Sequence, residues 1–275
     1  MPAPARTHPA MPALADPGLL RHEGYVAGWR GAAADFPVTD PATGAEVARV
    51  ARLGATEARA AVDAAAAAFP GWSGALPQVR SAALRRWFEA ILAHREDLAR
   101  IMVAEQGKPL SEARSEIDYG ASFVEFYAEE AKRPDILGVT SHLPDAEVEL
   151  WREPVGVAAL VTPWNFPGAM VTRKAAAALA AGCTCVVHPS AETPLSALAL
   201  AELAVRAGLP AGVFNVVPGD APEIVGEWTA DARVRALSFT GSTEVGRLLY
   251  RQSAATVKRL VLELGGHAPF LLFAD

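Results

Sequence analysis

The sequence contains few cysteines and lacks histidines at the spacing of zinc ligands. Its two cysteines, Cys183 and Cys185, stand two positions apart, a spacing that suits neither a disulfide framework nor, by itself, a metal site. The six histidines are scattered along the chain. We therefore expect no bound metal, and we expect the chain to act in a reducing compartment, the cytoplasm.

Long apolar runs and clusters of positive charge are also absent from the sequence. The longest uncharged apolar stretch lies between Lys174 and His188, which is shorter than the roughly 20 residues that a membrane-spanning helix needs. The net charge is -6, and acidic and basic residues are interspersed, so no basic stripe is available for nucleic-acid phosphates. These absences argue against a membrane span and against a nucleic-acid partner.

Hydrophobic residues make up 51% of the 275 positions, which is enough for one large core or two smaller ones. Residues 1–20 are rich in alanine and proline and lack the pattern of a secretory signal, so we expect a loose, disordered tail there. Apolar residues recur at helical spacing from Thr56 to about Lys132, which predicts two or three long helices. Gln106 to Pro109 should interrupt them, because glycine ends helices and the residue before proline avoids the helical conformation.

Around residue 143 the pattern changes from helical to extended. Residues 147–151 alternate polar and apolar side chains, which predicts a half-buried strand in a hairpin arm near 143–154. Short apolar runs separated by helical segments follow at 155–161, 183–187, 213–217, 236–239, 260–264 and 269–273. This alternation predicts an α/β fold with a doubly wound, Rossmann-like parallel sheet, whose ligands bind beyond the carboxyl ends of the strands.

The first motif at such a strand end is Pro163-Trp164-Asn165-Phe166-Pro167. Its two prolines hold Asn165 in a rigid turn, where the side-chain amide could donate a hydrogen bond to a developing oxyanion. The alternative is that Asn165 only supports its own turn.

The second motif, at 239–246, combines a strand end, a glycine turn and a helix start. Backbone amides around Gly241 and Ser242 would face an anion such as a pyrophosphate. The glycine spacing matches neither the usual dinucleotide fingerprint nor a P-loop, so a purely structural turn is the alternative.

The third motif places Glu263 at the end of an apolar run, just before Gly265 and Gly266, which let another group approach the backbone closely. A carboxylate at the edge of an apolar site suits a general base that activates water. The alternative is a glutamate at a strand end that faces solvent.

These motifs occur in the order seen in the aldehyde dehydrogenase superfamily, and the sequence resembles that family from about residue 20 to its end. Segments at 106–110, 172–174, 180–184, 210–217 and 265–270 resemble its succinate-semialdehyde dehydrogenase branch. The resemblance implies an aldehyde dehydrogenase-like fold and the NAD- or NADP-dependent oxidation of a small aldehyde, succinate semialdehyde, to succinate. Residues 21–275 would then form the dinucleotide-binding domain.

The resemblance also implies roles for individual residues. Asn165 would stabilise the thiohemiacetal oxyanion, and Glu263 would activate the water that hydrolyses the thioester. Arg173 resembles the arginine that pairs with the distal carboxylate of succinate semialdehyde through a charge-assisted bond; the alternative is an arginine on a helix surface. The residues implied in cofactor binding are Thr162, Trp164, His188, Ser190, Gly241, Ser242 and Leu264.

The nucleophilic cysteine of the family is missing. Family members carry it a few tens of residues after the glutamate, whereas 12 residues (275 minus 263) follow Glu263 here. Cys183 and Cys185 fall at the start of a predicted buried strand, away from Asn165, and are not expected to replace it. We therefore expect a chain truncated before its catalytic domain and inactive alone, because no thiohemiacetal forms without a thiolate. An exposed apolar surface should favour a homo-oligomer or aggregation.

Two other functions stay open. A non-catalytic module could keep dinucleotide affinity, or could join related chains through strand addition at the arm near 143–154. A reductase acting on acyl phosphates could use the same scaffold, although Asn165, Glu263 and Arg173 together disfavour it.

The expected cofactor is NADP or NAD, with NADP slightly favoured. The family usually has a lysine at the position of His188, and a neutral imidazole binds phosphate oxygens less strongly. Three residues further on, NAD-preferring relatives often carry a glutamate that repels a 2'-phosphate, and Ala191 cannot do so.

Overall fold

A computed structural model describes residues 11, 13–133 and 136–274 and contains a seven-stranded sheet in the order β11-β10-β7-β8-β9-β1-β2. The five strands from β11 to β9 run parallel, whereas β1 and β2 are antiparallel additions at one edge. The predicted doubly wound parallel sheet is therefore confirmed. The strands of this sheet are β1 (Gly24–Tyr25), β2 (Trp29–Arg30), β7 (Val157–Val161), β8 (Thr184–His188), β9 (Phe214–Val216), β10 (Val234–Gly241) and β11 (Arg259–Leu264).

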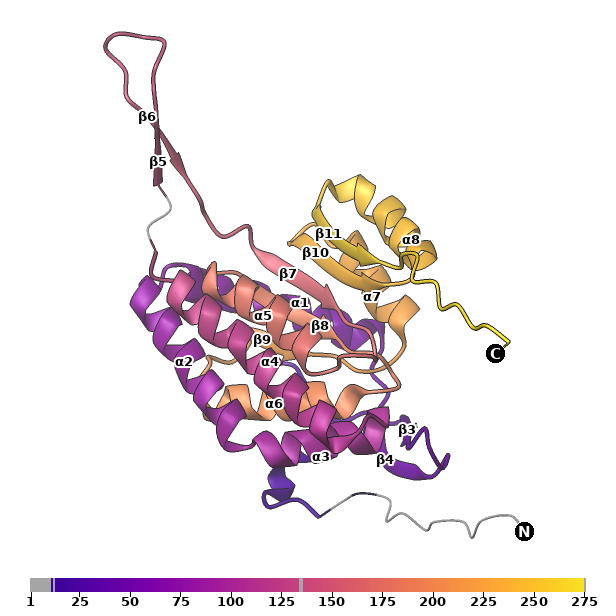
Figure 1. Ribbon diagram of the computed structural model, residues 1–275. Helices are drawn as coiled ribbons and strands as arrows, with labels where there is room; N and C mark the ends of the chain where they lie inside the picture. The colour runs from indigo at the N-terminus through magenta and orange to yellow at the C-terminus, as the bar shows by residue number, and fades with distance from the viewer. Residues whose placement is uncertain (1–10, 12, 134–135, 275) are drawn as a thin grey trace, which may run out of the picture.

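Helices cover both faces of the sheet, because β7 and β8 bury every side chain and need apolar partners on each side. Figure 1 shows α1, α7 and α8 on one face and α5 and α6 on the other. Their bounds are α1 (Ala55–Ser73), α5 (Ala169–Ala180), α6 (Pro194–Arg206), α7 (Ala221–Ala230) and α8 (Thr243–Ser253). No helix within the described ranges is long and apolar enough to cross a membrane.

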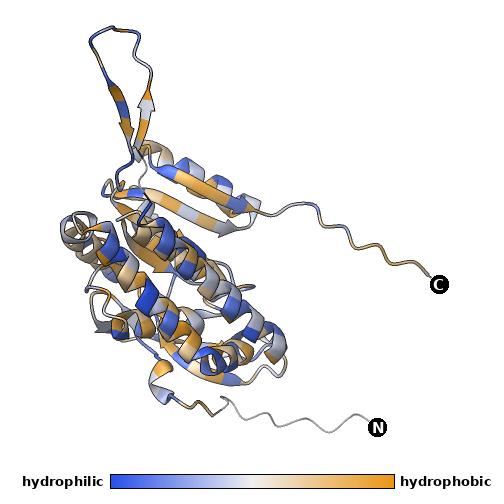
Figure 2. Ribbon diagram, turned by 60° about the vertical axis from the view of Figure 1, so that its left-hand side comes forward, coloured by the Kyte–Doolittle hydropathy of each residue, from blue (hydrophilic) through white to orange (hydrophobic). Residues whose placement is uncertain are grey.

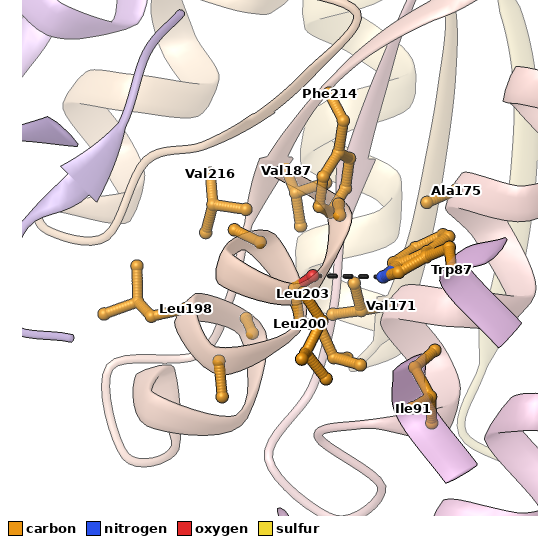
Figure 3. Packing of buried hydrophobic residues seen from close by; sticks show 14 of the residues in the cluster. Trp87, Ile91, Val171, Ala175, Val187, Leu198, Leu200, Leu203, Phe214 and Val216 are labelled. Atoms are coloured by element: carbon orange, nitrogen blue, oxygen red, sulfur yellow. Dashed lines mark hydrogen bonds between the residues drawn. The ribbon is translucent and has the colours of Figure 1, made fainter. Parts of the chain in front are cut away.

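Three further helices form an outer layer over α5 and α6: α2 (Pro77–Ala93), α3 (Arg95–Gln106) and α4 (Leu110–Glu130). Figure 3 shows how this layer is joined to the sheet: Trp87 of α2 packs on Phe214 of β9 and donates a hydrogen bond of 3.1 Å to the carbonyl of Leu200. With α1, the segment from Thr56 to Lys132 thus contains four helices, and the prediction of two or three was wrong. The predicted break is confirmed, since Gly107 adopts a left-handed conformation and ends α3.

The arm is a hairpin of β5 (Ile136–Val139) and β6 (Val148–Trp151) that projects from the body of the molecule (Figure 1). All four side chains of β6 are exposed, so the prediction of a half-buried strand was wrong. The alternation of polar and apolar residues here has no buried face to match. The remaining small sheet pairs β3 (Asp35–Thr39) with β4 (Glu46–Ala51).

Two sequence predictions near the ends of the chain need correction. Residues 269–273 form no strand, and Figure 2 shows this hydrophobic segment extending away from the body after β11. The predicted loose tail lies partly outside the described residues, at 1–10 and 12, but residues 13–20 pack on the body. Leu19 is fully buried there, in a short 3-10 helix (Pro17–Leu19), and the amides of Ala15 and Asp16 donate to the carboxylate of Asp97.

Candidate active site

The carboxyl ends of β7 and β8 bring together several of the residues implied in cofactor binding. The amide of Thr162 donates a 3.1 Å hydrogen bond to the carbonyl of His188, which extends the pairing of the two strands by one residue. Thr162 and His188 are buried, whereas Trp164 in the following turn is exposed. Ser190 follows in the loop after β8, where its hydroxyl donates to the carboxylate of Glu192.

The turn between β10 and α8 is closely packed. A β-carbon on Gly241 would lie 2.5 Å from Cζ of Phe239, and one on Gly246 would lie 2.5 Å from Cδ2 of Leu264. Ser242 is the N-cap of α8, and its hydroxyl accepts a 3.2 Å hydrogen bond from the amide of Val245. The other amides of the first turn have no partner within the helix, so this turn has the geometry of an anion site.

We call this group of residues, which consists of Thr162, His188, Ser190, Gly241, Ser242 and Leu264, the cofactor edge. His188 is its most enclosed polar side chain, and Nδ1 of the ring lies 2.9 Å from the carbonyl oxygen of Val217. Burial lowers the pKa of His188, and this hydrogen bond only partly opposes the effect. The imidazole is therefore neutral at pH 7.

A cavity of about 390 Å³, which we call the substrate cavity, lies between α5 and the strands β10 and β11. Alternate residues of β11 face opposite sides, so Leu262 and Leu264 pack toward α8 while Glu263 lines the cavity. Arg173 from α5 lines the same cavity. Among the described residues, neither Glu263 nor Arg173 forms an ion pair, although the guanidinium of Arg173 lies 5.5 Å from the ring centre of Phe123.

Lys174 also lines the substrate cavity, and our sequence analysis did not identify it as a site residue. Its Nζ donates a 2.7 Å hydrogen bond to the hydroxyl of Ser238 on β10. Burial, together with the smaller effect of the nearby positive charge of Arg173, lowers the pKa of Lys174 to about 8, and the negative charge of Glu263 partly opposes this shift. The only sequence signal was its position next to Arg173, since the burial depends on how α5 packs on β10.

The structure does not place Asn165 among the residues that line the substrate cavity. It lies in the exposed turn after β7, and its backbone carbonyl accepts a 3.0 Å hydrogen bond from Nζ of Lys108. Lys108 also pairs with the buried carboxylate of Glu116. Glu116 in turn accepts hydrogen bonds of 3.0 and 3.1 Å from the amides of Gly168 and Ala169, where α5 begins. A buried ion pair thus holds both ends of the turn that carries Asn165.

Neither cysteine can act together with Glu263. Cys183 lines the substrate cavity, but it precedes Thr184, which pairs with Val157, the first residue of β7. Glu263 pairs with Thr240, one residue beyond the opposite end of β7. This separation corresponds to about six residues along the sheet, or roughly 20 Å. Cys185 is fully buried, and burial raises the pKa of its thiol.

Comparisons with known proteins show to which family the chain is similar. Residues 29–275 match the model of the aldehyde dehydrogenase family. The chain is 52% identical over 265 residues to a glutarate-semialdehyde dehydrogenase of Pseudomonas putida. It is 51% identical over 267 residues to a protein of Escherichia coli that is named as an NADP(+) succinate-semialdehyde dehydrogenase. Each match covers 95% of this chain and 55% of the relative, so the chain spans about half the length of these curated relatives.

A solved structure of a succinate-semialdehyde dehydrogenase from Burkholderia pseudomallei has a similar fold. It superposes with a TM-score of 0.92 at 52% sequence identity. The match covers 96% of this chain and 55% of that structure.

Proposed function

The chain belongs to the aldehyde dehydrogenase family, and from this premise we propose that it contributes to the oxidation of succinate semialdehyde to succinate with NAD or NADP. One observation supports this substrate best: Arg173 and Glu263 line the same cavity without an ion-pair partner among the described residues. A guanidinium in that position can pair with a carboxylate at the far end of a short aldehyde. Two relatives named above act on semialdehydes that carry such a carboxylate.

In the proposed mechanism, each residue has a distinct task. Arg173 binds the distal carboxylate and so orients the aldehyde carbonyl, while the amide of Asn165 donates to the oxygen that becomes negative. Glu263 takes a proton from the water that releases the acid. The residues of the cofactor edge would hold the dinucleotide, which would supply the hydride acceptor for this oxidation.

The same mechanism needs a thiolate beside Glu263, and the 275 residues hold none there. Cys183 is about 20 Å away along the sheet, and Cys185 is buried. We therefore expect the 275-residue chain to bind a dinucleotide without oxidising an aldehyde.

A chimera tests this function. It joins the chain to the part of the Escherichia coli relative that the match does not cover, which should supply the family's cysteine. Arg173→Met in the chimera should raise KM for succinate semialdehyde by about tenfold or more, because a charge-assisted bond is lost. It should leave KM for an uncharged aldehyde of similar length unchanged. Arg251→Met, an exposed arginine at the end of α8, is the matched control. Equal effects on both substrates would contradict the assignment of Arg173.

The arm supports a second function, the association of copies of this chain. Its exposed apolar side chains are Leu137, Val139, Leu143, Val148, Leu150 and Trp151. A two-stranded ribbon is rarely stable alone, and strand addition to a second copy would bury these side chains. Sedimentation should show a concentration-dependent dimer or larger species that Leu150→Glu weakens.

That the protein is located in the cytoplasm stays a prediction.

A further inference from the structure

Lys174 is a charged residue of the substrate cavity to which the proposed mechanism assigns no task. Its side chain is half-buried between α5 and β10, where the hydroxyl of Ser238 accepts its hydrogen bond of 2.7 Å. This is the one hydrogen bond that Nζ forms with the described residues, and none of their carboxylates forms an ion pair with it. An ammonium group has three hydrogens to donate, so the described part of the chain offers no acceptor to two of them.

The groups that face Lys174 do little to hold its positive charge. Arg173 precedes it on α5 and repels the ammonium, and Glu263 on β11 attracts it without forming an ion pair. The other titratable side chains that line the cavity are Tyr127 of α4 and Cys183 before β8, and neither is a carboxylate. Burial is the largest effect and lowers the pKa of Lys174 to about 8. In mildly alkaline solution much of the side chain is therefore a neutral amine, which has a lone pair and is a nucleophile.

The cavity brings this amine close to the place where an aldehyde would lie. Ser238, which accepts from Nζ of Lys174, pairs with Val261 of β11. Glu263 follows two residues later on the same face of β11, about 7 Å further along the strand. Arg173 lines the same cavity and would hold the distal carboxylate of the aldehyde. A short aldehyde bound in this way would have its carbonyl carbon within reach of the amine.

We propose that Lys174 binds an aldehyde covalently, as an imine, when the aldehyde carries a carboxylate that pairs with Arg173. The neutral amine attacks the carbonyl carbon and forms a carbon–nitrogen bond, and a proton passes from the nitrogen to the carbonyl oxygen. Loss of that oxygen as water, with one proton taken from the solvent, leaves a protonated imine near the negative charge of Glu263. No group is oxidised or reduced, and the addition of water reverses the step. The proposal rests on the proposed function, because that function makes the cavity a site for such an aldehyde.

Trapping with borohydride tests the proposal in the 275-residue chain. Borohydride added after a set time reduces an imine to a stable secondary amine, and peptide mapping by mass spectrometry identifies the lysine that carries it. With succinate semialdehyde at pH 8, we expect Lys174 to be labelled at least about tenfold faster than the exposed Lys132, because a larger fraction of Lys174 than of an ordinary lysine is neutral at this pH. The labelling rate at Lys174 should rise with pH and level off above about pH 8.

Lys258 is the matched control within the same chain. It is buried, burial lowers its pKa, and its Nζ donates to the carbonyls of Asp231 and Val234, outside the substrate cavity. We expect little or no adduct on Lys258, which would show that a lowered pKa alone does not cause the labelling. Lys174→Met should remove the fast adduct. If this variant does not fold, the mapping of the unmodified chain still decides the question.

Arg173→Met tests the selectivity for a carboxylate. It should slow labelling by succinate semialdehyde by about tenfold relative to labelling by butanal, because only the first aldehyde loses a charge-assisted bond. A change in the pKa of Lys174 would affect both aldehydes alike, so the ratio of the two rates isolates this bond. Adducts spread over exposed lysines with none enriched at Lys174 would overturn the inference and leave the proposed function intact. Equally fast labelling of Lys174 by both aldehydes in the unmodified chain would instead overturn the proposed function, and with it the selectivity for a carboxylate.

Discussion

The cofactor edge and the substrate cavity differ in how their polar side chains are bonded. At the cofactor edge, His188, Ser190 and Ser242 each hydrogen-bond to another group of the chain. In the cavity, Arg173 and Glu263 form no hydrogen bond or ion pair with the described residues. Polar groups that a fold leaves unpaired are available to a ligand, whereas paired groups mainly maintain the fold. The charged groups of the cavity are therefore available to a ligand, whereas hydrogen bonds within the chain fix the polar side chains of the cofactor edge.

Like Arg173 and Glu263, the side chain of Asn165 forms no hydrogen bond with the described residues, but its backbone is anchored by the Lys108–Glu116 ion pair. The largest effect should come from breaking this anchor. Lys108→Met leaves the carboxylate of Glu116, which is nearly inaccessible to solvent, without its cation. We expect the free energy of unfolding to fall by about 3 to 5 kcal/mol in urea denaturation.

The control for this change is Lys132→Met, which breaks an exposed ion pair with Glu129 and should leave the urea midpoint almost unchanged. Similar losses for both variants would show that the anchor is an ordinary surface pair. The turn itself, and not the Lys108–Glu116 ion pair, would then fix the backbone position of Asn165.

Lys174, unlike Arg173 and Glu263, forms a hydrogen bond within the described part of the chain, and its titration offers the next largest effect. Its pKa is about 8 in the folded chain, below the ordinary lysine value of 10.5. Between these values the unfolded chain binds more protons, so the free energy of unfolding should rise with pH from about 8 to about 10.5. Relative to Lys174→Met, the unmodified chain should gain about 2 kcal/mol between pH 7 and pH 9.5. A difference that stays constant over this range would mean that Lys174 is effectively solvated.

The sequence predicted the sheet well because its signals are local. Each run of consecutive apolar residues became a parallel strand where helices cover both faces, as in β7 and β8. The rule for apolar runs was wrong at 269–273, where no strand forms, and the alternation at β6 predicted the strand but not the exposure of all its side chains. Local pattern alone does not reveal whether another layer of structure covers a strand.

The sequence predicted those parts of the candidate site that depend on residues close to one another along the chain. The turn at Gly241 and Ser242 and the position of Glu263 on one face of β11 follow from sequence order and strand alternation. Lys108 and Glu116 could not be found in this way, because Glu116 lies 52 residues before Gly168, whose amide it binds. Their importance comes from burial and long-range contact, which one sequence does not display.

The packing of α8 on β11 tests whether the cofactor edge is as closely fitted as its hydrogen bonds indicate. Gly246→Ala adds a methyl group 2.5 Å from Leu264, at a cost of roughly 2 kcal/mol, and regains about 1 kcal/mol of helix propensity. We expect a net loss of about 1 kcal/mol in stability. Gly226→Ala, in α7 with no atom within 4 Å, should instead stabilise the chain by up to about 1 kcal/mol. Stabilisation by both substitutions would show that α8 is loosely packed.

Substitutions of Ser242 can distinguish two properties of the cofactor edge: the stability of the start of α8, and the free backbone amides that could bind an anion. Ser242→Ala removes the cap on Val245 and should cost about 1 kcal/mol of stability, but dinucleotide affinity should change by less than about twofold because the backbone amides remain. Ser242→Asp should keep the cap and the stability, yet weaken dinucleotide binding by about tenfold, since its carboxylate would face the pyrophosphate. Thermal melting and titration of both variants measure these effects separately. If Ser242→Ala abolished binding while Ser242→Asp preserved it, the hydroxyl, and not the helix terminus, would be the group that recognises the cofactor.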